Sequence, residues 1–524
     1  MESRFKSFGH DSTPKEYPVP FSSSDLIACP SSTFHPDGVA NYMSGCMNCP
    51  KCVSVEKEST CNYLGQIQCL DQSLKFVRGD MNGDGILSQR EVLRLFYVVT
   101  EGMFWGRNYS KWAQMNVNEC SLPGIHCKEG KVTKIDLRGA TLCVTKPCEG
   151  IPREIGELGE SLEVLDLSTS FSSHVSIEIP SSIGMLTKLK ILDLSHNHVK
   201  EIPSEIGLIS SLHILNLLNC GYHGPIPPAI WKLKELEILN LNENLFTDQK
   251  LPSDLGHLTN LKELLFADSH IKGTIPFEIG ALTNLKNLEI YDNELSGTLP
   301  SSFKMLRQMK RIDMLNNTIE GTLDWILDMP EIEVLNVRDN KFHGRIPSKI
   351  GDLKMLAWVD LSGNMFTGEI PSSFADILNL RNLRLGNNRL QPPIPPRLCQ
   401  NLQINGPINP AGYDATNACN HIICPMGTHS KRGLGSPVKD STCQQCDEGE
   451  TTLHLGQTSC LRIGQYEMLT MFDALMNNKE WKIDKVGSRN KCDLEVATCD
   501  DDGQVIGLNI PLAGIRFDEE LFQG

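Results

Sequence analysis

The 524-residue chain is long enough for two or three ordinary domains, or for one long repeat array with flanking modules. Its formal net charge is −15, from 64 acidic and 49 basic side chains, and Lys and Arg are not clustered, which excludes a conventional nucleic-acid-binding surface. No run of about 18 apolar residues occurs, so no segment of the sequence is predicted to span a membrane.

The cysteines gather at the two ends of the sequence. Ten of the 19 lie between Cys29 and Cys148, eight lie between Cys399 and Cys499, and Cys220 stands alone in the middle. This distribution indicates disulfide-bonded modules and an oxidising compartment, with Cys220 left over. Residues 1–28 are expected to form a disordered tail, and they lack the apolar core of a signal peptide. We therefore expect an extracellular or cell-surface protein, and a chain that is a fragment of a longer one.

Residues 29–69 form a first cysteine-rich module. Cys46 and Cys49, with Cys52 nearby, can be interpreted as half a zinc site. Disulfide pairing is favoured, because a second copy of the module at 424–462 keeps only Cys443 and Cys446 as a close pair, and neither copy supplies a His-x3-His pair. Both copies resemble the small "C-P-x-x-T" modules of the ephrin-receptor type.

Residues 70–101 contain a calcium-loop pattern. The segment 80–91 reads D-M-N-G-D-G-I-L-S-Q-R-E, which matches the EF-hand loop. Hard oxygen ligands in this order suit Ca²⁺ better than a transition metal. The predicted ligands are the side chains or, for the isoleucine, the backbone carbonyl of Asp80, Asn82, Asp84, Ile86, Ser88 and Glu91.

The calcium loop is predicted to be a structural clamp. The segment "REVLRLFYVVTEG" after it is predicted to be an amphipathic helix, and no second loop pairs with it. Three carboxylates without a partner loop predict weak affinity, about 10⁻⁴ to 10⁻³ M. The alternative is an acidic turn that binds no ion.

A repeat of about 24 residues fills the segment 132–398. An Ile-Pro or Leu-Pro pair recurs along it, and Leu323-Asp324 stands in for one missing pair. The pattern L-x-x-L-x-L-x-x-N precedes most pairs, as at Leu236, Leu239, Leu241 and Asn244. The apolar positions belong to short strands that neighbouring repeats must cover. The Asn side chain is expected to bond backbone groups of adjacent turns, and Cys220 to replace one such Asn.

The period and the segments "NELSGTLPSSF" and "NMFTGEIPSSF" resemble the plant-type leucine-rich-repeat class. The resemblance implies an α/β repeat fold, a solenoid of about ten repeats. It also implies a helical, disulfide-bonded cap at 102–131, with Trp112 ahead of a Cys120–Cys127 pair. A C-terminal flank covers 399–423.

The cap pattern returns at 463–524, where Trp481 precedes a Cys492–Cys499 pair. This second cap ends where a further array is expected to begin, so we expect the chain to be truncated there. The whole layout resembles large leucine-rich-repeat surface proteins of photosynthetic microbes.

The ligand is expected on the concave side of the array. The x position between the last two apolar slots is mostly Asp or Asn, so unusual residues are more informative. Exposed aromatic and Arg side chains are favoured at interfaces. The predicted ligand-binding residues are Leu218, Leu265, Tyr291, Leu315, Arg338 and Trp358. Glycosylation sequons start at Asn108 and at Asn316, and a glycan on Asn316 would argue against this face.

The sequence therefore predicts a non-enzymatic recognition module that binds a protein, peptide or glycan. No phosphate loop, G-x-S-x-G, H-E-x-x-H or kinase signature occurs. Two alternatives stay open: a secreted inhibitor of wall-degrading enzymes, and a structural wall or adhesion protein.

Overall fold

The computed structural model describes the chain in segments. They are residues 87–114, 117–144, 150–247, 249–401 and 403–405, followed by short stretches of the C-terminal module between 422 and 462. Paired backbone strands are described outside them: β1 (Leu26–Ala28) with β3 (Val39–Asn41), β2 (Thr33–Phe34) with β4 (Met47–Asn48), and β29 (Ala497–Cys499) with β30 (Val505–Leu508). The chain divides into two compact units, Met1–Ile209 and Ser210–Gly524.

The first unit starts the array with helix α1 (Gln89–Val99) and three short 3₁₀ helices. An antiparallel hairpin, β5 (Ile125–Lys128) and β6 (Lys131–Asp136), then gives way to parallel strands β7 (Val164–Asp166) and β9 (Ile191–Asp193). The remaining elements of this unit are β8 (Ser176–Glu178), β10 (His198–Glu201), η1 (Gly102–Phe104), η2 (Arg107–Ala113), η3 (Glu119–Ser121), η4 (Arg153–Leu158), η5 (Ser181–Met185) and η6 (Ser204–Leu208).

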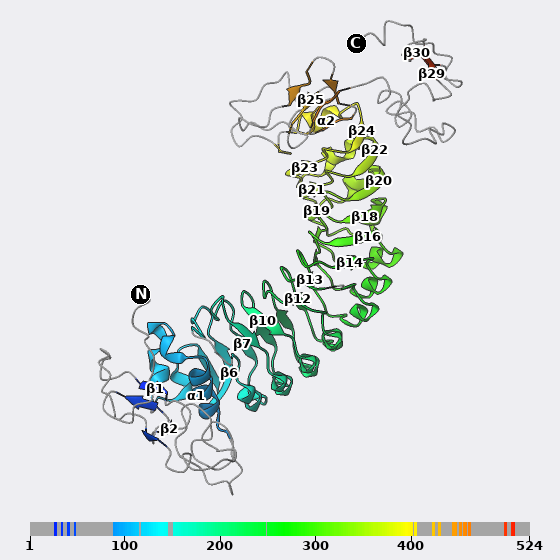
Figure 1. Ribbon diagram of the computed structural model, residues 1–524. Coiled ribbons are helices and arrows are strands. Elements are labelled where there is room, and N and C mark those ends of the chain that lie inside the picture. The colour runs from blue at the N-terminus through cyan, green and yellow to red at the C-terminus, as the bar shows by residue number, and fades with distance from the viewer. Residues whose placement is uncertain are drawn as a thin grey trace. The chain divides into compact units, whose positions relative to one another are not determined.

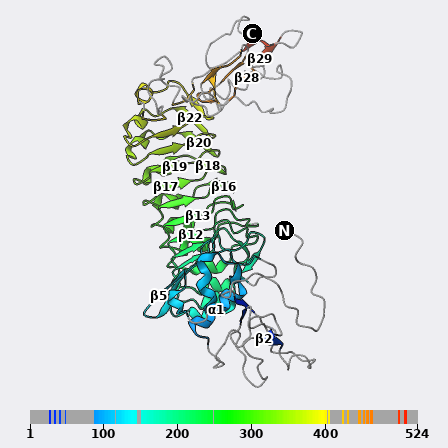
Figure 2. The same cartoon turned by 90° about the vertical axis from the view of Figure 1, so that its left-hand side faces the viewer.

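The second unit contains two rows of parallel strands, and from the repeat of β13 onward each repeat adds one strand to each row (Figures 1 and 2). The main row, here called the sheet face, is β11 (Ile214–Asn216), β12 (Ile238–Asn240), β13 (Glu263–Leu265), β15 (Asn287–Glu289), β17 (Arg311–Asp313), β19 (Val334–Asn336), β21 (Trp358–Asp360) and β23 (Asn382–Arg384). The side row is β14 (Lys272–Gly273), β16 (Glu294–Thr298), β18 (Thr318–Gly321), β20 (Lys341–Arg345), β22 (Met365–Glu369) and β24 (Arg389–Gln391). These repeats confirm the predicted leucine-rich-repeat solenoid.

Short 3₁₀ helices close the repeats of the second unit except the last, which ends in the α-helix α2 (Pro396–Cys399). Most of them follow a proline N-cap, whose fixed φ and missing N–H suit the start of a helix. Five residues are too few for a stable α-helix, and the tighter 3₁₀ turn fits that length. They are η7 (Pro228–Lys232), η8 (Ser253–His257), η9 (Phe277–Ala281), η10 (Ser301–Met305), η11 (Asp324–Asp328), η12 (Ser348–Asp352) and η13 (Ser372–Asp376).

Asparagine side chains connect consecutive repeats, as the sequence predicts. Asn340 Nδ2 donates to the carbonyl of Met314, 2.8 Å away, and its Oδ1 accepts from the backbone N–H of Ile319 at 3.0 Å. The same arrangement recurs at Asn197, Asn244, Asn293, Asn317, Asn364 and Asn388. Cys220 is a buried thiol in one such slot, with Sγ 3.8 Å from the carbonyl oxygen of Leu218, so its predicted role as a substitute is confirmed.

The C-terminal cysteine-rich module covers the end of the array. It follows helix α2 (Pro396–Cys399) and contains the hairpins β25 (Thr428–His429) with β26 (Gln444–Gln445) and β27 (Glu450–Thr451) with β28 (Leu461–Arg462). The Asn387 N–H donates to the carbonyl of Gly456 at 2.7 Å, and the Leu455 N–H donates to the carbonyl of Leu390 at 3.2 Å. Disulfides Cys424–Cys443 and Cys446–Cys460 hold the module together, which confirms disulfide pairing there.

Candidate functional site

Helix α1 begins where the predicted calcium loop requires its exit helix to begin. Gln89 is the tenth residue of the loop pattern and the first of the helix, which confirms the predicted helix. Ser88 is the N-cap: its side chain accepts from the N–H of Glu91, and Glu91 Oε2 accepts from the Ser88 N–H at 2.8 Å. The other predicted ligands, Asp80, Asn82, Asp84 and Ile86, lie outside the described residues.

The carboxylate of Glu91 lies in the right place for a calcium ligand, but it is almost completely buried. It is turned back toward the loop by the capping interaction, and only 5% of the residue is exposed. An ion bound in the loop would balance the charge of this buried carboxylate. The two described members of the ligand set, Ser88 and Glu91, therefore fit Ca²⁺, and the calcium site stays a prediction.

The predicted N-terminal cap is confirmed. Cys120 and Cys127 form a disulfide, and Trp112 Nε1 donates to the carbonyl of Pro123 at 2.9 Å. The side chain of Gln89 accepts from the N–H of Val132 at 2.6 Å, which attaches the start of α1 to the first strand of the array. For the second cap, Cys492 lies outside the described residues, so its pairing with Cys499 stays a prediction.

The six predicted ligand residues all lie on the sheet face, but only some are neighbours. Leu265 ends β13, Tyr291 follows β15 and Leu315 follows β17, so they occupy three consecutive repeats. Backbone hydrogen bonds link these repeats directly: the N–H of Asp268 donates to Tyr291, and the N–H of Asp292 donates to Leu315. Leu218 lies in an earlier repeat and is separate from this group.

Arg338 and Trp358 each have a charged partner. Arg338 is exposed, and its Nε lies 2.9 Å from Asp339 Oδ2. Trp358 starts β21 and is covered by the guanidinium of Arg384, whose Cζ is 5.0 Å from the ring centroid. Arg384 Nη1 also lies 3.4 Å from the buried carboxylate of Asp360. Trp358 is therefore less available to a ligand than the sequence suggests, and Arg384 joins the candidate site.

An alternating charge cluster borders the Leu265–Tyr291–Leu315 group. Arg311 lies between Glu289, at 3.0 Å, and Asp313, at 3.3 Å. Burial raises the pKa of Asp313, against hydrogen bonds from Asn336 and from the Leu315 N–H that lower it. Burial, and then the nearby carboxylates, raise the pKa of the Tyr291 phenol. The phenol is therefore protonated at neutral pH and can donate a hydrogen bond.

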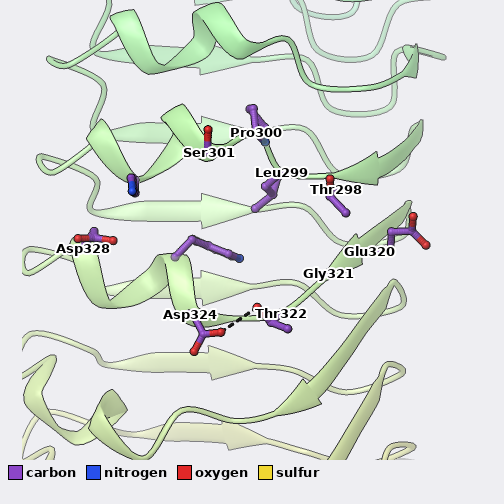
Figure 3. Close-up of a pocket in the computed structure, with 11 residues that line it drawn as sticks. Thr298, Leu299, Pro300, Ser301, Glu320, Gly321, Thr322, Asp324 and Asp328 are labelled. Carbon is purple, nitrogen blue, oxygen red and sulfur yellow. Dashed lines mark hydrogen bonds between the residues drawn. The ribbon is translucent and has the colours of Figure 1, made fainter.

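The structure also shows a cavity that the sequence pattern did not indicate. It measures about 480 Å³ and lies between the repeats that contain η10 and η11 (Figure 3). Leu323 is the N-cap of η11, the position that proline has in the neighbouring helices. Relative to the start of the helix, the pair Leu323-Asp324 therefore stands one residue later than an Ile-Pro pair, and the segment between the N-caps of η10 and η11 is one residue shorter than the sequence pattern implies. This shorter segment is the signal that could have located the cavity.

Comparisons with known proteins agree with the repeat architecture. A leucine-rich-repeat region model matches residues 160–343, and a single leucine-rich-repeat model matches residues 355–377. The receptor protein-tyrosine kinase CEPR1 of Arabidopsis thaliana is 28% identical over 198 residues, which is 36% of this chain and 20% of that protein. The TMV resistance protein N of Nicotiana glutinosa is 31% identical over 235 residues, or 43% of this chain and 17% of that protein.

A solved structure with a comparable fold is the leucine-rich-repeat ectodomain of the Arabidopsis receptor kinase HAESA, in complex with an N-terminally extended IDA peptide hormone. It is 28% identical, has a TM-score of 0.50, and the alignment covers 61% of this chain and 56% of that one. The chain thus spans a fifth or less of the two curated relatives and about half of this ectodomain. Among the helices that the structure describes, none is long and apolar enough to cross a membrane.

Proposed function

We propose that this chain, a leucine-rich-repeat protein of the plant receptor-like type, binds an extended peptide on its sheet face. The observation that carries the proposal is the group of Leu265, Tyr291 and Leu315 on three consecutive repeats. Corresponding positions in other repeats are mostly small or polar. Large side chains of this kind act as anchors at protein interfaces.

The spacing of these side chains suits an extended backbone. Neighbouring strands lie roughly 4.8 Å apart, so the three repeats span about 10 Å, and an extended chain covers that distance with about three residues. A peptide that crosses the strands can therefore place an apolar side chain on half-buried Leu315, whereas Leu265, which is only 8% exposed, offers it little surface. The phenol of Tyr291, in the repeat beside Leu315, supplies a hydrogen-bond donor that a peptide carbonyl can accept.

The charged side chains around Leu265, Tyr291 and Leu315 would affect which peptide sequences bind more than how tightly they bind. Arg311 is already neutralised by Glu289 and Asp313, and Arg338 is held by Asp339. Such partly exposed pairs contribute little net affinity, but they disfavour a ligand that presents an unmatched charge. The preferred segment is therefore apolar or neutral at the positions that contact Tyr291 and Leu315.

The similar ectodomain supports the class of ligand. The HAESA structure holds a peptide hormone, and by analogy an extracellular location is proposed for this chain, in line with its disulfides. We further propose that the loop 80–91 binds Ca²⁺ as a structural element. Its exit helix is bonded to the first strand of the array through Gln89, so an ion there would stiffen the N-terminal cap.

The test is selection of binders from a displayed library of random 12-residue peptides against the full chain. Selected peptides should lose at least about tenfold in affinity for the variants Tyr291→Ala and Leu315→Ala, because each removes a half-buried side chain that the ligand would cover, worth roughly 1–2 kcal/mol. Met305→Ala is the control, since Met305 is exposed on η10, away from the sheet face. Binders that are insensitive to both sheet-face variants, or equally sensitive to the control, would contradict the proposal.

A further inference from the structure

The cavity between η10 and η11 lies away from the sheet face and has a distinctive composition. Its walls come from two consecutive turns, one at 298–304 and one at 320–328 (Figure 3). Three carboxylates, one ammonium group and one indole ring line it, together with threonine and serine hydroxyls; these charged and aromatic residues are Glu320, Asp324, Asp328, Lys304 and Trp325.

A change in the repeat pattern creates the cavity. In neighbouring repeats a buried isoleucine precedes the proline, as at Ile275 and Ile346, which are 6% and 4% exposed. In the repeat of η11, an exposed threonine, Thr322, stands at this position, and Leu323 replaces the proline. Leu299 of the preceding repeat is consequently only half-buried, and it forms part of the cavity wall.

The carboxylates of this cavity differ from those on the sheet face. On the sheet face Lys310 pairs with Glu333 and Arg311 with Glu289. Within the described part of the chain, by contrast, Glu320 and Asp328 have no ion pair within 4.0 Å, and Asp324 accepts only the hydroxyl of Thr322 at 2.9 Å. With Lys304 counted, the cavity has a formal charge of −2. Such a site favours a cation.

The indole ring adds a second feature that favours a cation. Trp325 packs edge-on against Phe303, with ring centroids 5.3 Å apart, and another part of it lines the cavity. Its Nε1–H is buried and has no acceptor among the described residues, so the ring contributes a π surface rather than a donor. The equivalent positions in adjacent helices are the small or charged residues Ser302 and Lys349. The buried Nε1–H of Trp325 without an acceptor is unfavourable for folding, so a tryptophan at this position is better explained by a role in binding than by stability.

We propose that this cavity binds the guanidinium group of an arginine side chain from a peptide or protein partner. The planar cation would lie against the indole, where the ring quadrupole attracts it, and its N–H groups would donate to the carboxylate of Asp328. Glu320 lies at the opposite side of the cavity and would contribute its negative charge without a direct hydrogen bond (Figure 3). The backbone of the partner would contact the hydroxyls of Thr298 and Ser301 at the rim. This site is independent of the sheet-face proposal, since it shares no residue with it.

The probe is acetyl-Gly-Arg-Gly-amide, titrated at low ionic strength into the full chain labelled with 5-fluorotryptophan. The fluorine signal of Trp325 is assigned by its loss in Trp325→Phe, and it should shift saturably. The double variant E320Q/D328N should weaken binding at least fivefold, by roughly the effect of one partly exposed charge pair and one more distant negative charge. The matched control E278Q/D352N changes exposed carboxyl groups in η9 and η12 and should stay within about twofold of the parent.

Two control ligands decide the chemistry. The peptide with citrulline in place of arginine keeps the shape of the side chain without its charge, and it should leave the Trp325 signal unmoved. An equal shift with citrulline, unchanged affinity in E320Q/D328N, or displacement of the probe by the neutral sugar methyl cellobioside would overturn the proposal. The last result would assign the cavity to a glycan instead. Circular dichroism of each variant checks that the array is intact.

Discussion

Replacing Asn340 by alanine should destabilise the array locally, by an amount that follows from its hydrogen bonds. Its Nδ2 donates to the carbonyls of Met314, Val337 and Arg338, and its Oδ1 accepts from the N–H of Ile319. Each carbonyl keeps another donor after the change, from Asn317, Asn364 and the backbone of Asn316 respectively. The Ile319 N–H loses its acceptor, and that residue is 1% exposed.

The expected cost is therefore dominated by one orphaned donor. A buried N–H without an acceptor costs about 1–3 kcal/mol, and the lost bonds to still-paired carbonyls add about 1 kcal/mol together, which gives roughly 2–4 kcal/mol in total. Because repeat proteins can open locally, the change should appear as faster hydrogen exchange around Ile319. An opening equilibrium shifted by 2–4 kcal/mol predicts a rate increase of about 30- to 700-fold, measurable by mass spectrometry.

The control is Asn382→Ala. Asn382 starts β23 on the sheet face and is half-exposed, and no side-chain hydrogen bond is recorded for it in the described part of the chain. This variant should change the free energies obtained from hydrogen exchange and from urea unfolding by no more than about 0.5 kcal/mol each. Equal effects of the two substitutions, or normal exchange around Ile319 in Asn340→Ala, would refute the argument that the asparagine side chains hold the repeats together.

Three further predictions concern calcium, pH and the C-terminal module. Calcium should raise the melting temperature of the parent but not of the double variant D80A/E91A, and equal shifts in both would exclude the EF-hand. The raised pKa of Asp313 means that the folded state binds more protons than the unfolded state above about pH 4, so this group's contribution to stability falls as pH rises through its folded pKa. Asp313→Asn should therefore gain stability relative to the parent between about pH 4 and pH 7, and parallel melting curves across that range would contradict the assignment. Replacing both Cys446 and Cys460 by serine should cost about 2–4 kcal/mol and expose the last repeat to proteolysis, whereas an unchanged digestion pattern would show that the disulfide does not support the end of the array.

Positions that recur in every repeat could be predicted from the sequence. The inward Leu positions and the bonds of Asn244 or Asn364 follow from the pattern itself, because the same environment is repeated along the array. The Cys120–Cys127 disulfide followed from the resemblance to plant-type caps. These predictions needed only local spacing and the requirement that each repeat cover its neighbour.

Features that depend on side chains found in only one pair of neighbouring repeats, or on contacts outside the array, could not be predicted. The guanidinium of Arg384 covers Trp358 because the two residues lie on adjacent strands, and the sequence does not show which rotamer reaches across. The cavity near Trp325 arises because Thr322 replaces an isoleucine, whereas the sequence pattern placed Leu323-Asp324 in register. The contact of Gly456 with the last repeat joins segments that have no common period.

The calcium site remains a sequence prediction for a different reason. Four of its six ligands lie outside the described residues, and the described Ser88 and Glu91 form a capping box that a helix without calcium can also form. The pattern of the loop is therefore more informative than the geometry of its exit helix. The melting experiment on D80A/E91A separates these two interpretations.

The hydrogen bonds that Leu455 and Gly456 make with the final repeat have a consequence for how such a chain can change in length over evolution. The C-terminal module recognises backbone groups of the last repeat, at Asn387 and Leu390, and each Asn of the array reaches back one repeat. A duplicated segment of one whole repeat can therefore enter the interior, since every new coil meets the same partners as the old ones. An insertion of any other length would break the asparagine bonds on both sides of it. Lineages of this protein should thus differ by whole repeats between unchanged ends, and the spacing of ligand contacts along the sheet face would change in steps of one strand.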